Sequence, residues 1–185
     1  MADKLFVCGV NPMRVPQFLQ QQRVLFQSLY HAPAYSAPRL AKHLGLHGSE
    51  VAKAVLLKGP VSFCLGVMPS TYQINWSVLE AEMGGVVRLA DDEEASQIFQ
   101  DCEYGVVPPF GRLYGLDTYL DSSISRDAWI VFDAHTSVEA IRMHCEDYER
   151  LENPHRLPFG IPDYRWLRSV MEARTNSRMI GSRHR

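Results

Sequence analysis

The sequence lacks the short motifs that mark the common cofactor, metal and hydrolase classes. It contains no His-Glu-x-x-His helix pattern, no Gly-x-Ser-x-Gly elbow, no phosphate-binding P-loop and no dinucleotide Gly-x-Gly-x-x-Gly. The four cysteines are scattered without a Cys-x-x-Cys pair, which argues against a zinc knuckle or a redox dithiol. We therefore expect no metal, no organic cofactor and thiols that stay reduced.

Long apolar runs are also missing. The longest, residues 51–57, is interrupted by Lys53 and is far too short to span a bilayer, and the N-terminus lacks the basic-then-apolar order of a secretory signal. The 185 residues are 46% hydrophobic and 22% charged, which is typical of an ordinary globular protein. We expect a single domain, no membrane partner and a cytoplasmic location.

Charge and proline content divide the chain into a predicted domain, residues 1–153, and a Pro- and Arg-rich extension, residues 154–185. From Arg150 to Arg185 eight arginines face three acidic residues, a net charge of +5, so residues 1–149 carry −7 of the total −2. Such a tail is either a binding site for a phosphate backbone or a solvated segment without a partner. The candidate contacts to phosphates of a nucleic acid are Arg165, Arg168, Arg174 and Arg178.

The spacing of apolar residues predicts helices followed by interleaved strands and helices. The predicted helices are residues 14–30, 36–44, 76–83, 91–99 and 164–173, with a helical turn at 146–151; the predicted strands are residues 51–58, 61–67, 86–89, 114–120, 128–132 and 138–143. Pro154, Pro158 and Pro162 are expected to break regular structure between them. This order predicts a mixed α/β fold, a sheet or barrel with helices outside.

Lys53 is the unusual residue of its predicted strand. A period of two places it on the same apolar face as Val51, Val55 and Leu57. Because an unpaired buried ammonium is costly, either the side chain snorkels to solvent or this face borders a polar pocket. Both alternatives are open on the strand alone.

Residues 101–111 form a stiff loop, Asp-Cys-Glu-Tyr-Gly-Val-Val-Pro-Pro-Phe-Gly. Gly105 and Gly111 can adopt positive φ, while Pro108 and Pro109 restrict the backbone around them. The loop is either a rigid corner between a helix and a strand, or a wall whose exposed amides hold a carbonyl, carboxylate or hydroxyl group.

Three side chains at the start of this loop carry weaker signals. Cys102 has no Lys, Arg or His beside it in sequence to lower its thiol pKa, which favours a structural thiol over a nucleophile. Asp101 and Glu103 are expected to be a solvated helix end, with contact to a substrate amine as the alternative.

Taken together, Lys53 and the loop resemble the YbaK/prolyl-tRNA synthetase-associated domain family. The similarity covers roughly residues 15–153. It rests on Glu50-Val51-Ala52-Lys53-Ala54-Val55, on Gly105-Val106-Val107-Pro108-Pro109 with Phe110-Gly111, on Tyr35-Ser36-Ala37, on Tyr119-Leu120-Asp121 and on Glu139-Ala140-Ile141-Arg142-Met143 with Asp147-Tyr148.

The resemblance implies a mixed, barrel-like sheet surrounded by helices and a trans-acting aminoacyl-tRNA deacylase, which hydrolyses the ester of mischarged tRNA. Its partners would be the acceptor end of that tRNA and an aminoacyl-tRNA synthetase. It implies catalytic roles for Lys53 and Gly105. The substrate-binding residues implied or inferred from their position are Val106, Val107, Pro108, Pro109, Phe110, Gly111, Asp121 and His135.

One turn departs from the family pattern. His135 stands where glycine is expected and Ser137 where histidine is expected. This change leaves open a non-catalytic tRNA- or synthetase-binding module that retains the pocket, and a hydrolase of another small aminoacyl ester. For His135 itself we expect an exposed turn histidine rather than a catalytic replacement, and for Asp121 a turn aspartate is as good a reading as a site residue.

Overall fold

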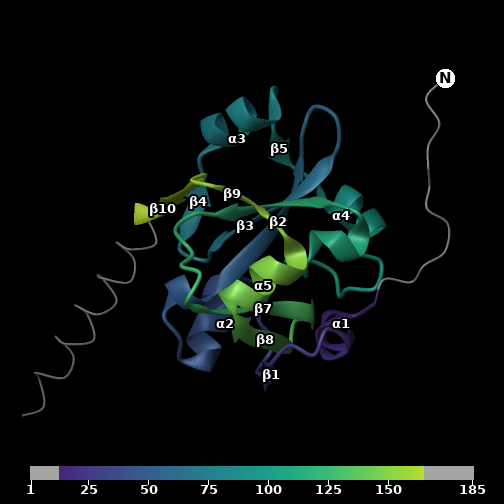
Figure 1. The fold of residues 1–185 in the computed structure, drawn as a ribbon, viewed down its shortest axis with the longest axis vertical. Coiled ribbons are helices and arrows are strands. Elements are labelled where there is room, and N and C mark those ends of the chain that lie inside the picture. The colour runs from purple at the N-terminus through teal and green to yellow at the C-terminus, as the bar shows by residue number, and fades with distance from the viewer. Residues whose placement is uncertain (1–12, 165–185) are drawn as a thin grey trace, which may run out of the picture.

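In residues 13–164, which the computed structural model describes, the strands form three sheets with five α-helices packed around them (Figure 1). In chain order the helices are α1 (Val15–Gln21), α2 (Ala37–Leu44), α3 (Trp76–Met83), α4 (Asp92–Ile98) and α5 (Cys145–Glu152), with 3₁₀ turns η1 (Gly48–Glu50) and η2 (Gly111–Tyr114). The strands are β1 (Phe26–Tyr30), β2 (Ala52–Lys58), β3 (Phe63–Pro69), β4 (Tyr72–Ile74), β5 (Arg88–Leu89), β6 (Asp117–Asp121), β7 (Trp129–Thr136), β8 (Glu139–His144), β9 (His155–Leu157) and β10 (Gly160–Pro162).

The largest sheet has the strand order β5-β2-β3-β6-β9. Its centre is the antiparallel β2–β3 hairpin, whose pairing is continuous along β2 from Ala52 to Lys58. The Gly59 amide donates to the Ser62 carbonyl at 3.0 Å across the connecting turn, which confirms the predicted hairpin. Strand β6 lies parallel to β3, and β9 lies parallel to β6, so the sheet is mixed.

The second sheet, β1-β8-β7, is antiparallel, and β4 pairs with β10 to form the third. A parallel bridge between Val51 and Val131 joins the start of β2 to β7. Side chains from both larger sheets fill a shared core that includes Ala52, Phe132 and Ile141. No sheet among the described residues closes on itself, so the mixed α/β prediction is confirmed and its barrel-like form is not.

The predicted helix over residues 14–30 is wrong in its second half. Helix α1 ends at Gln21, and Arg23 adopts a positive φ of 55° that turns the chain. Residues 26–30 then form β1, which pairs along its whole length with β8. The ladder of hydrogen bonds to β8 outweighs the helical spacing of the apolar residues, a case of tertiary pairing overriding local pattern.

The other predicted helices within the described residues are confirmed, because their ends carry local signals. Helix α2 ends at Gly45 and α3 at Gly84, both left-handed with φ of 65° and 69°. At the start of α4, Asp91 accepts from the Glu94 amide at 2.9 Å and Glu94 accepts from the Asp91 amide at 3.0 Å, forming the predicted capping box. Glu94 also pairs with Lys58, which ties α4 to β2.

The proline-containing segment after α5 is more ordered than predicted. Strand β9 lies between Pro154 and Pro158, and β10 ends at Pro162. Phe159, between these strands, is fully buried. It packs in a cluster with Leu57 of β2 and Met68 of β3. The packed part of the chain therefore continues past residue 153, to at least Pro162, whereas the predicted helix at 164–173 lies outside the described residues except for Tyr164.

A search of the described helices for a membrane span was negative: none of those in residues 13–164 combines the length and the apolar character that a bilayer crossing needs.

Candidate functional site

The loop at residues 101–111 has an exposed half and a buried half. Gly105 is exposed and adopts a φ of 82°, as predicted. Pro108, Pro109 and Phe110 are buried. The centroid of the Phe110 ring lies 5.2 Å from the centroid of the Tyr148 ring in the core. The Tyr148 hydroxyl donates to the Pro109 carbonyl at 2.7 Å. The second half of the loop is thus an anchor, and its first half faces outward.

A pocket of about 230 Å³ lies on the outward side of this loop. It is lined by α4 and the residues that follow it, and by the loop from Cys102 to Val107. Of the predicted substrate-binding residues, Val106 and Val107 belong to this lining together with Gly105, whereas Pro108 to Gly111 do not. A space of this size suits a small group rather than a whole nucleotide.

Gly111 is required for close packing and not for an unusual backbone angle. A Cβ at this position would lie 2.5 Å from Thr118 Oγ1 and 2.8 Å from the Leu116 carbonyl oxygen. The buried Glu152 carboxylate holds the same corner, accepting from Thr118 Oγ1 at 2.5 Å and from the Arg112 amide at 3.2 Å. Burial raises the pKa of Glu152 to about 7, although these hydrogen bonds lower it.

The raised pKa of Glu152 predicts a pH-dependent stability. Between pH 4.5, near the ordinary glutamate pKa, and pH 7, the folded state holds a proton that the unfolded state has lost, so the unfolding free energy falls as pH rises. Glu152→Gln should reduce this slope, to which Asp133 also contributes because burial raises its pKa to about 7, and should add up to about 3 kcal/mol above pH 7. Urea unfolding at pH 5, 6, 7 and 8 measures it. Glu146→Gln, an exposed site on the same helix, should keep the wild-type slope; an unchanged slope in Glu152→Gln would contradict the assignment.

The start of the loop is clamped to the turn that departs from the family pattern. The Glu103 amide donates to the His135 carbonyl at 2.7 Å. Its carboxylate accepts from both the amide and the hydroxyl of Ser137, each at 2.8 Å. These bonds lower the pKa of Glu103. Glu103 is exposed, as expected, but its carboxylate also binds a specific partner, Ser137.

His135 is not the exposed turn histidine that we expected. It is 2% exposed, and its Nε2 lies 3.1 Å from Asp101 Oδ2 and 3.3 Å from the Tyr114 hydroxyl. Burial lowers the pKa of His135, and Asp101 counteracts this effect. Strand β7 continues to Thr136, which carries His135 inward instead of leaving it on a turn.

Cys102 lies beside this group. Its thiol is 3.4 Å from the Tyr114 hydroxyl and 3.7 Å from Asp101 Oδ1. Burial raises the pKa of the Cys102 thiol to about 12, which disfavours a nucleophilic role, because the thiolate is the reactive form. Asp101 belongs to the same cluster and is only 9% exposed in its side chain, so it is not the solvated helix end we expected.

Lys53 occupies the predicted face of β2, together with Leu57, and finds partners there. Its ammonium donates to the backbone carbonyls of Tyr72 and, at 3.4 Å, Ser70, where β3 turns into β4. Burial lowers the pKa of Lys53, and the charge of Asp163 raises it. The side chain is half-buried, and its ammonium is held by the turn.

Lys53 and the loop pack on different sides of β2. Val107 packs with Leu56 and Leu65, and Leu56 leaves the strand on the face opposite to Lys53. Lys53 and the loop therefore lie on opposite faces of β2. The ammonium does not enter the pocket beside Gly105.

Asp121 serves the packing of neighbouring strands. It is 1% exposed, and it accepts from the amide and hydroxyl of Ser123 and from the Gly160 amide. A Cβ at Gly160 would lie 2.8 Å from Asp121 Cγ, so glycine permits this approach. These contacts account for the carboxylate at the end of β6, away from the pocket lining.

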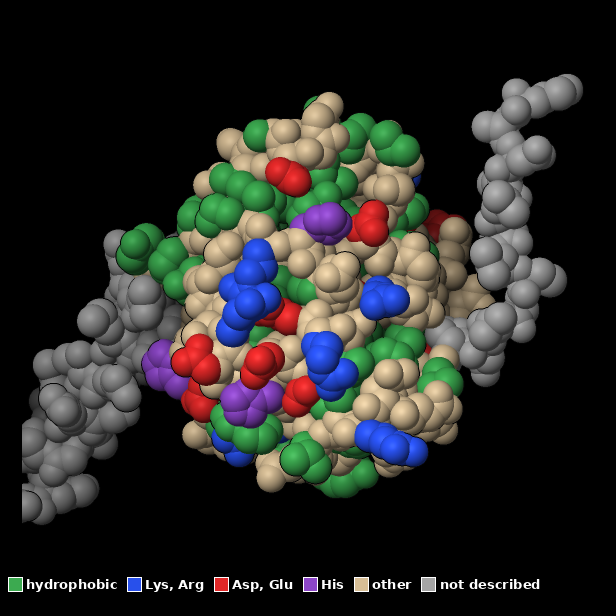
Figure 2. All heavy atoms as spheres, viewed as in Figure 1, with side chains coloured by type: hydrophobic (Ala, Val, Ile, Leu, Met, Phe, Trp, Pro, Cys, Tyr) green, Lys and Arg blue, Asp and Glu red, His purple; other side chains and the backbone are tan. Residues whose placement is uncertain are grey.

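In the view of Figure 2, acidic and basic side chains are interspersed over the described surface. They do not form one continuous basic patch on this face. On α5, Glu149 pairs with Arg126 and Arg156, and Asp147 pairs with Arg150 at 2.8 Å. The predicted tRNA contacts Arg165, Arg168, Arg174 and Arg178 lie outside the described residues.

Sequence patterns missed the residues that hold the loop. Ser137 and Glu103 are 34 residues apart, as are Thr118 and Glu152. Tyr114 closes the group around Asp101 from η2. No local motif signals pairs at such separations, because only the packed sheets bring them together.

The sequence establishes the family. The model of the aminoacyl-tRNA editing domain matches residues 31–151. This match spans most of the described chain and includes Lys53, the loop and the turn at His135. The protein belongs to the aminoacyl-tRNA editing domain family. A search of curated proteins found no match.

Three solved structures share the fold at low sequence identity. The hypothetical protein APE2540 has a TM-score of 0.72 and 16% identity over 80% of this chain and 99% of its own. A candidate trans-editing enzyme for prolyl tRNA synthetase has a TM-score of 0.65 and 19% identity over 77% and 93%. A candidate signal transduction protein from Marinobacter aquaeolei VT8 has a TM-score of 0.62 and 15% identity over 80% of this chain and 30% of its own. At these identities the likeness shows the fold.

Proposed function

We propose that the protein is a trans-acting aminoacyl-tRNA deacylase, which hydrolyses the ester of mischarged tRNA. The observation that carries this proposal is the preformed pocket beside Gly105, built by a loop that lies within the matched editing domain. The solved structure described as a candidate trans-editing enzyme for prolyl tRNA synthetase supports the same class of reaction.

The pocket suits a reaction that needs positioning more than a reactive side chain. An aminoacyl ester is already activated, and the neighbouring ribose hydroxyl or a water molecule can attack or carry the proton. The Val106 amide donates to the Glu103 carbonyl at 2.9 Å. The amides of Gly105 and Val107 have no acceptor among residues 13–164, and we assign them to hold the ester, the ribose hydroxyl or the water.

Lys53 enters this proposal through its place in the family pattern. Its ammonium holds the carbonyls of Ser70 and Tyr72 on the far side of β2 from the loop. We propose that it positions this turn for the acceptor end of the tRNA, with direct contact to the ester as the alternative. Arg165, Arg168, Arg174 and Arg178 are proposed to contact tRNA phosphates.

A binding module without turnover is the second candidate. The side chains of His135 and Ser137 favour it, because they are engaged by Asp101 and Glu103 instead of facing a substrate. Cleavage of a panel of mischarged tRNAs separates the two functions. Ester loss above the spontaneous rate supports the deacylase, saturable binding without cleavage supports the module, and equal cleavage of aminoacyl esters lacking the tRNA body identifies a small-ester hydrolase.

The clamp between Glu103 and Ser137 should matter for the reaction rate. Ser137→Ala removes one of the two donors to Glu103 and loosens the loop two residues before Gly105. We expect kcat/KM to fall about tenfold, because small displacements of positioning groups are costly. Glu103→Gln and the double variant should give similar losses, since the two side chains act as one unit.

Deacylation kinetics of the two single variants and the double variant measure this coupling. Ser125→Ala, an exposed serine on the loop before β7 that contacts Asp127, is the matched control and should behave as wild type. Additive losses in the double variant would contradict a shared clamp.

A further inference from the structure

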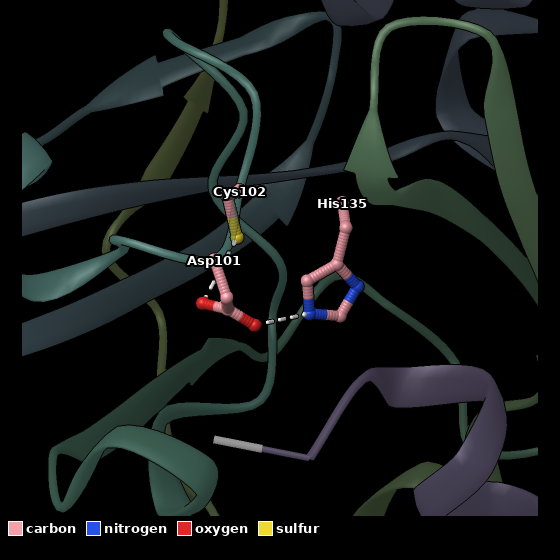
Figure 3. A group of neighbouring side chains, drawn as sticks. All are labelled: Asp101, Cys102 and His135. Atoms are coloured by element: carbon pink, nitrogen blue, oxygen red, sulfur yellow. Dashed lines mark hydrogen bonds and ion pairs between the residues drawn. The ribbon is translucent and has the colours of Figure 1, made fainter. Parts of the chain in front are cut away.

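Four side chains from three parts of the chain converge behind the pocket. Asp101 and Cys102 come from the start of the loop and His135 from β7 (Figure 3). Tyr114 comes from η2. The potential ligand atoms of Asp101, Cys102 and His135 all lie within 4.8 Å of one another. The sequence predicted no metal, because these residues form no motif with short spacing.

Two separations between potential ligand atoms, which involve different oxygens of Asp101, are close to those around a small tetrahedral cation. Asp101 Oδ2 lies 3.1 Å from His135 Nε2, and Asp101 Oδ1 lies 3.7 Å from Cys102 Sγ. Zinc bonds of about 2.0 Å to nitrogen or oxygen and about 2.3 Å to sulfur place neighbouring ligands roughly 3.3–3.7 Å apart in a tetrahedron. Small side-chain shifts would therefore bring the three atoms onto one ion.

The ligand types select the class of metal. One thiolate, one imidazole and one carboxylate suit a borderline-soft cation such as Zn²⁺, whereas Mg²⁺ and Ca²⁺ prefer oxygen ligands throughout. The Tyr114 hydroxyl lies 3.1 and 3.3 Å from the two oxygens of Asp101, 3.3 Å from His135 Nε2 and 3.4 Å from Cys102 Sγ. These are the spacings of a neighbouring ligand, so the hydroxyl is placed for the fourth position around the ion.

Access and charge are also favourable. His135 is 2% exposed, yet Cys102 lines the pocket beside Gly105, which gives an ion a route to the group. Arg14 and Glu139 add charges of opposite sign near His135. With the thiolate formed, the negative charges of Asp101, Cys102 and Glu139 balance a divalent ion together with Arg14.

We propose that Asp101, Cys102 and His135 form a binding site for one Zn²⁺-class divalent cation, which ties the start of the loop to β7. The site does not depend on the proposed deacylase function. Bound there, the cation would fix the inner wall of the pocket and stabilise the folded chain, since it binds this geometry and not the unfolded state.

The test uses the full chain without an affinity tag, stripped with a chelator and titrated with Zn²⁺ and with Co²⁺ as a spectroscopic probe. We expect one equivalent to bind, with a sulfur-to-cobalt charge-transfer band and a raised Tm. Cys102→Ala should abolish the band, and both Cys102→Ala and His135→Gln should weaken Zn²⁺ binding at least about 100-fold. Cys145→Ala, which changes a buried cysteine outside the cluster, should bind as wild type.

Circular dichroism of the metal-stripped variants shows whether each remains folded. Should one of the two fail to fold, the other and the cobalt band of the wild type still decide the question. Absence of a charge-transfer band in the wild type, or binding that survives both Cys102→Ala and His135→Gln, would overturn the site.

Discussion

Lys53→Met should reduce deacylation of a cleavable mischarged tRNA by two orders of magnitude or more, while the protein stays folded. A misplacement of about 1 Å in the groups that position a substrate costs about a factor of 10² in rate, even when the mutation lies far from the chemistry. Methionine keeps most of the side-chain volume on this face of β2 but cannot donate to the carbonyls of Ser70 and Tyr72. Single-turnover kinetics at saturating enzyme separate this loss of rate from a loss of tRNA binding.

Lys42→Met is the control for Lys53→Met, because Lys42 is exposed in the last turn of α2. It should deacylate at the wild-type rate. The structure also allows a purely structural role for Lys53, in which the ammonium only satisfies two backbone carbonyls. That role predicts that Lys53→Met has a lower Tm but near-normal turnover. This pair of results would show that Lys53 has no part in the reaction.

Gly111→Ala should destabilise the fold by about 3 kcal/mol and lower the Tm by roughly 6–12 °C. The added methyl group would lie 2.5 Å from Thr118 Oγ1 and 2.8 Å from the Leu116 carbonyl oxygen, which belongs to the backbone and cannot rotate away. The corner held by Glu152 would have to open to make room. Thermal and urea unfolding measure the effect.

Gly105→Ala provides the comparison for Gly111→Ala, because the two glycines have different roles. Gly105 adopts a φ of 82° in open space, so alanine meets no neighbour and costs only the backbone strain of about 1–2 kcal/mol. A Gly111→Ala protein as stable as wild type, or less destabilised than Gly105→Ala, would show that position 111 does not need glycine for close packing.

Local signals in the sequence were sufficient to predict the elements whose ends are set by residues close to them in the chain. The capping box of Asp91 and Glu94 and the left-handed glycine after α3 identified their helices. The β2–β3 hairpin followed from two apolar runs around Gly59-Pro60. Each of these features is decided by residues a few positions apart, which is why pattern reasoning finds them.

Elements decided by distant partners could not be predicted in this way. Residues 26–30 have helical spacing but complete a sheet with β8, and the segment between Pro154 and Pro162 adds two short strands. The candidate site shows the same division. The backbone of Gly105 was identified from its loop, whereas the inward position of His135 depends on β7 and on Asp101.

Hydrolysis of an aminoacyl ester on tRNA is the reaction that we propose for the pocket beside Gly105. The most direct measurement is the first-order loss of ester from each member of a mischarged tRNA panel, with enzyme in excess and buffer alone as reference. We expect at least one member to be cleaved well above its spontaneous rate, and Gly105→Ala to slow this cleavage while tRNA binding is retained. Spontaneous rates across the whole panel, with the protein folded and tRNA bound, would contradict it.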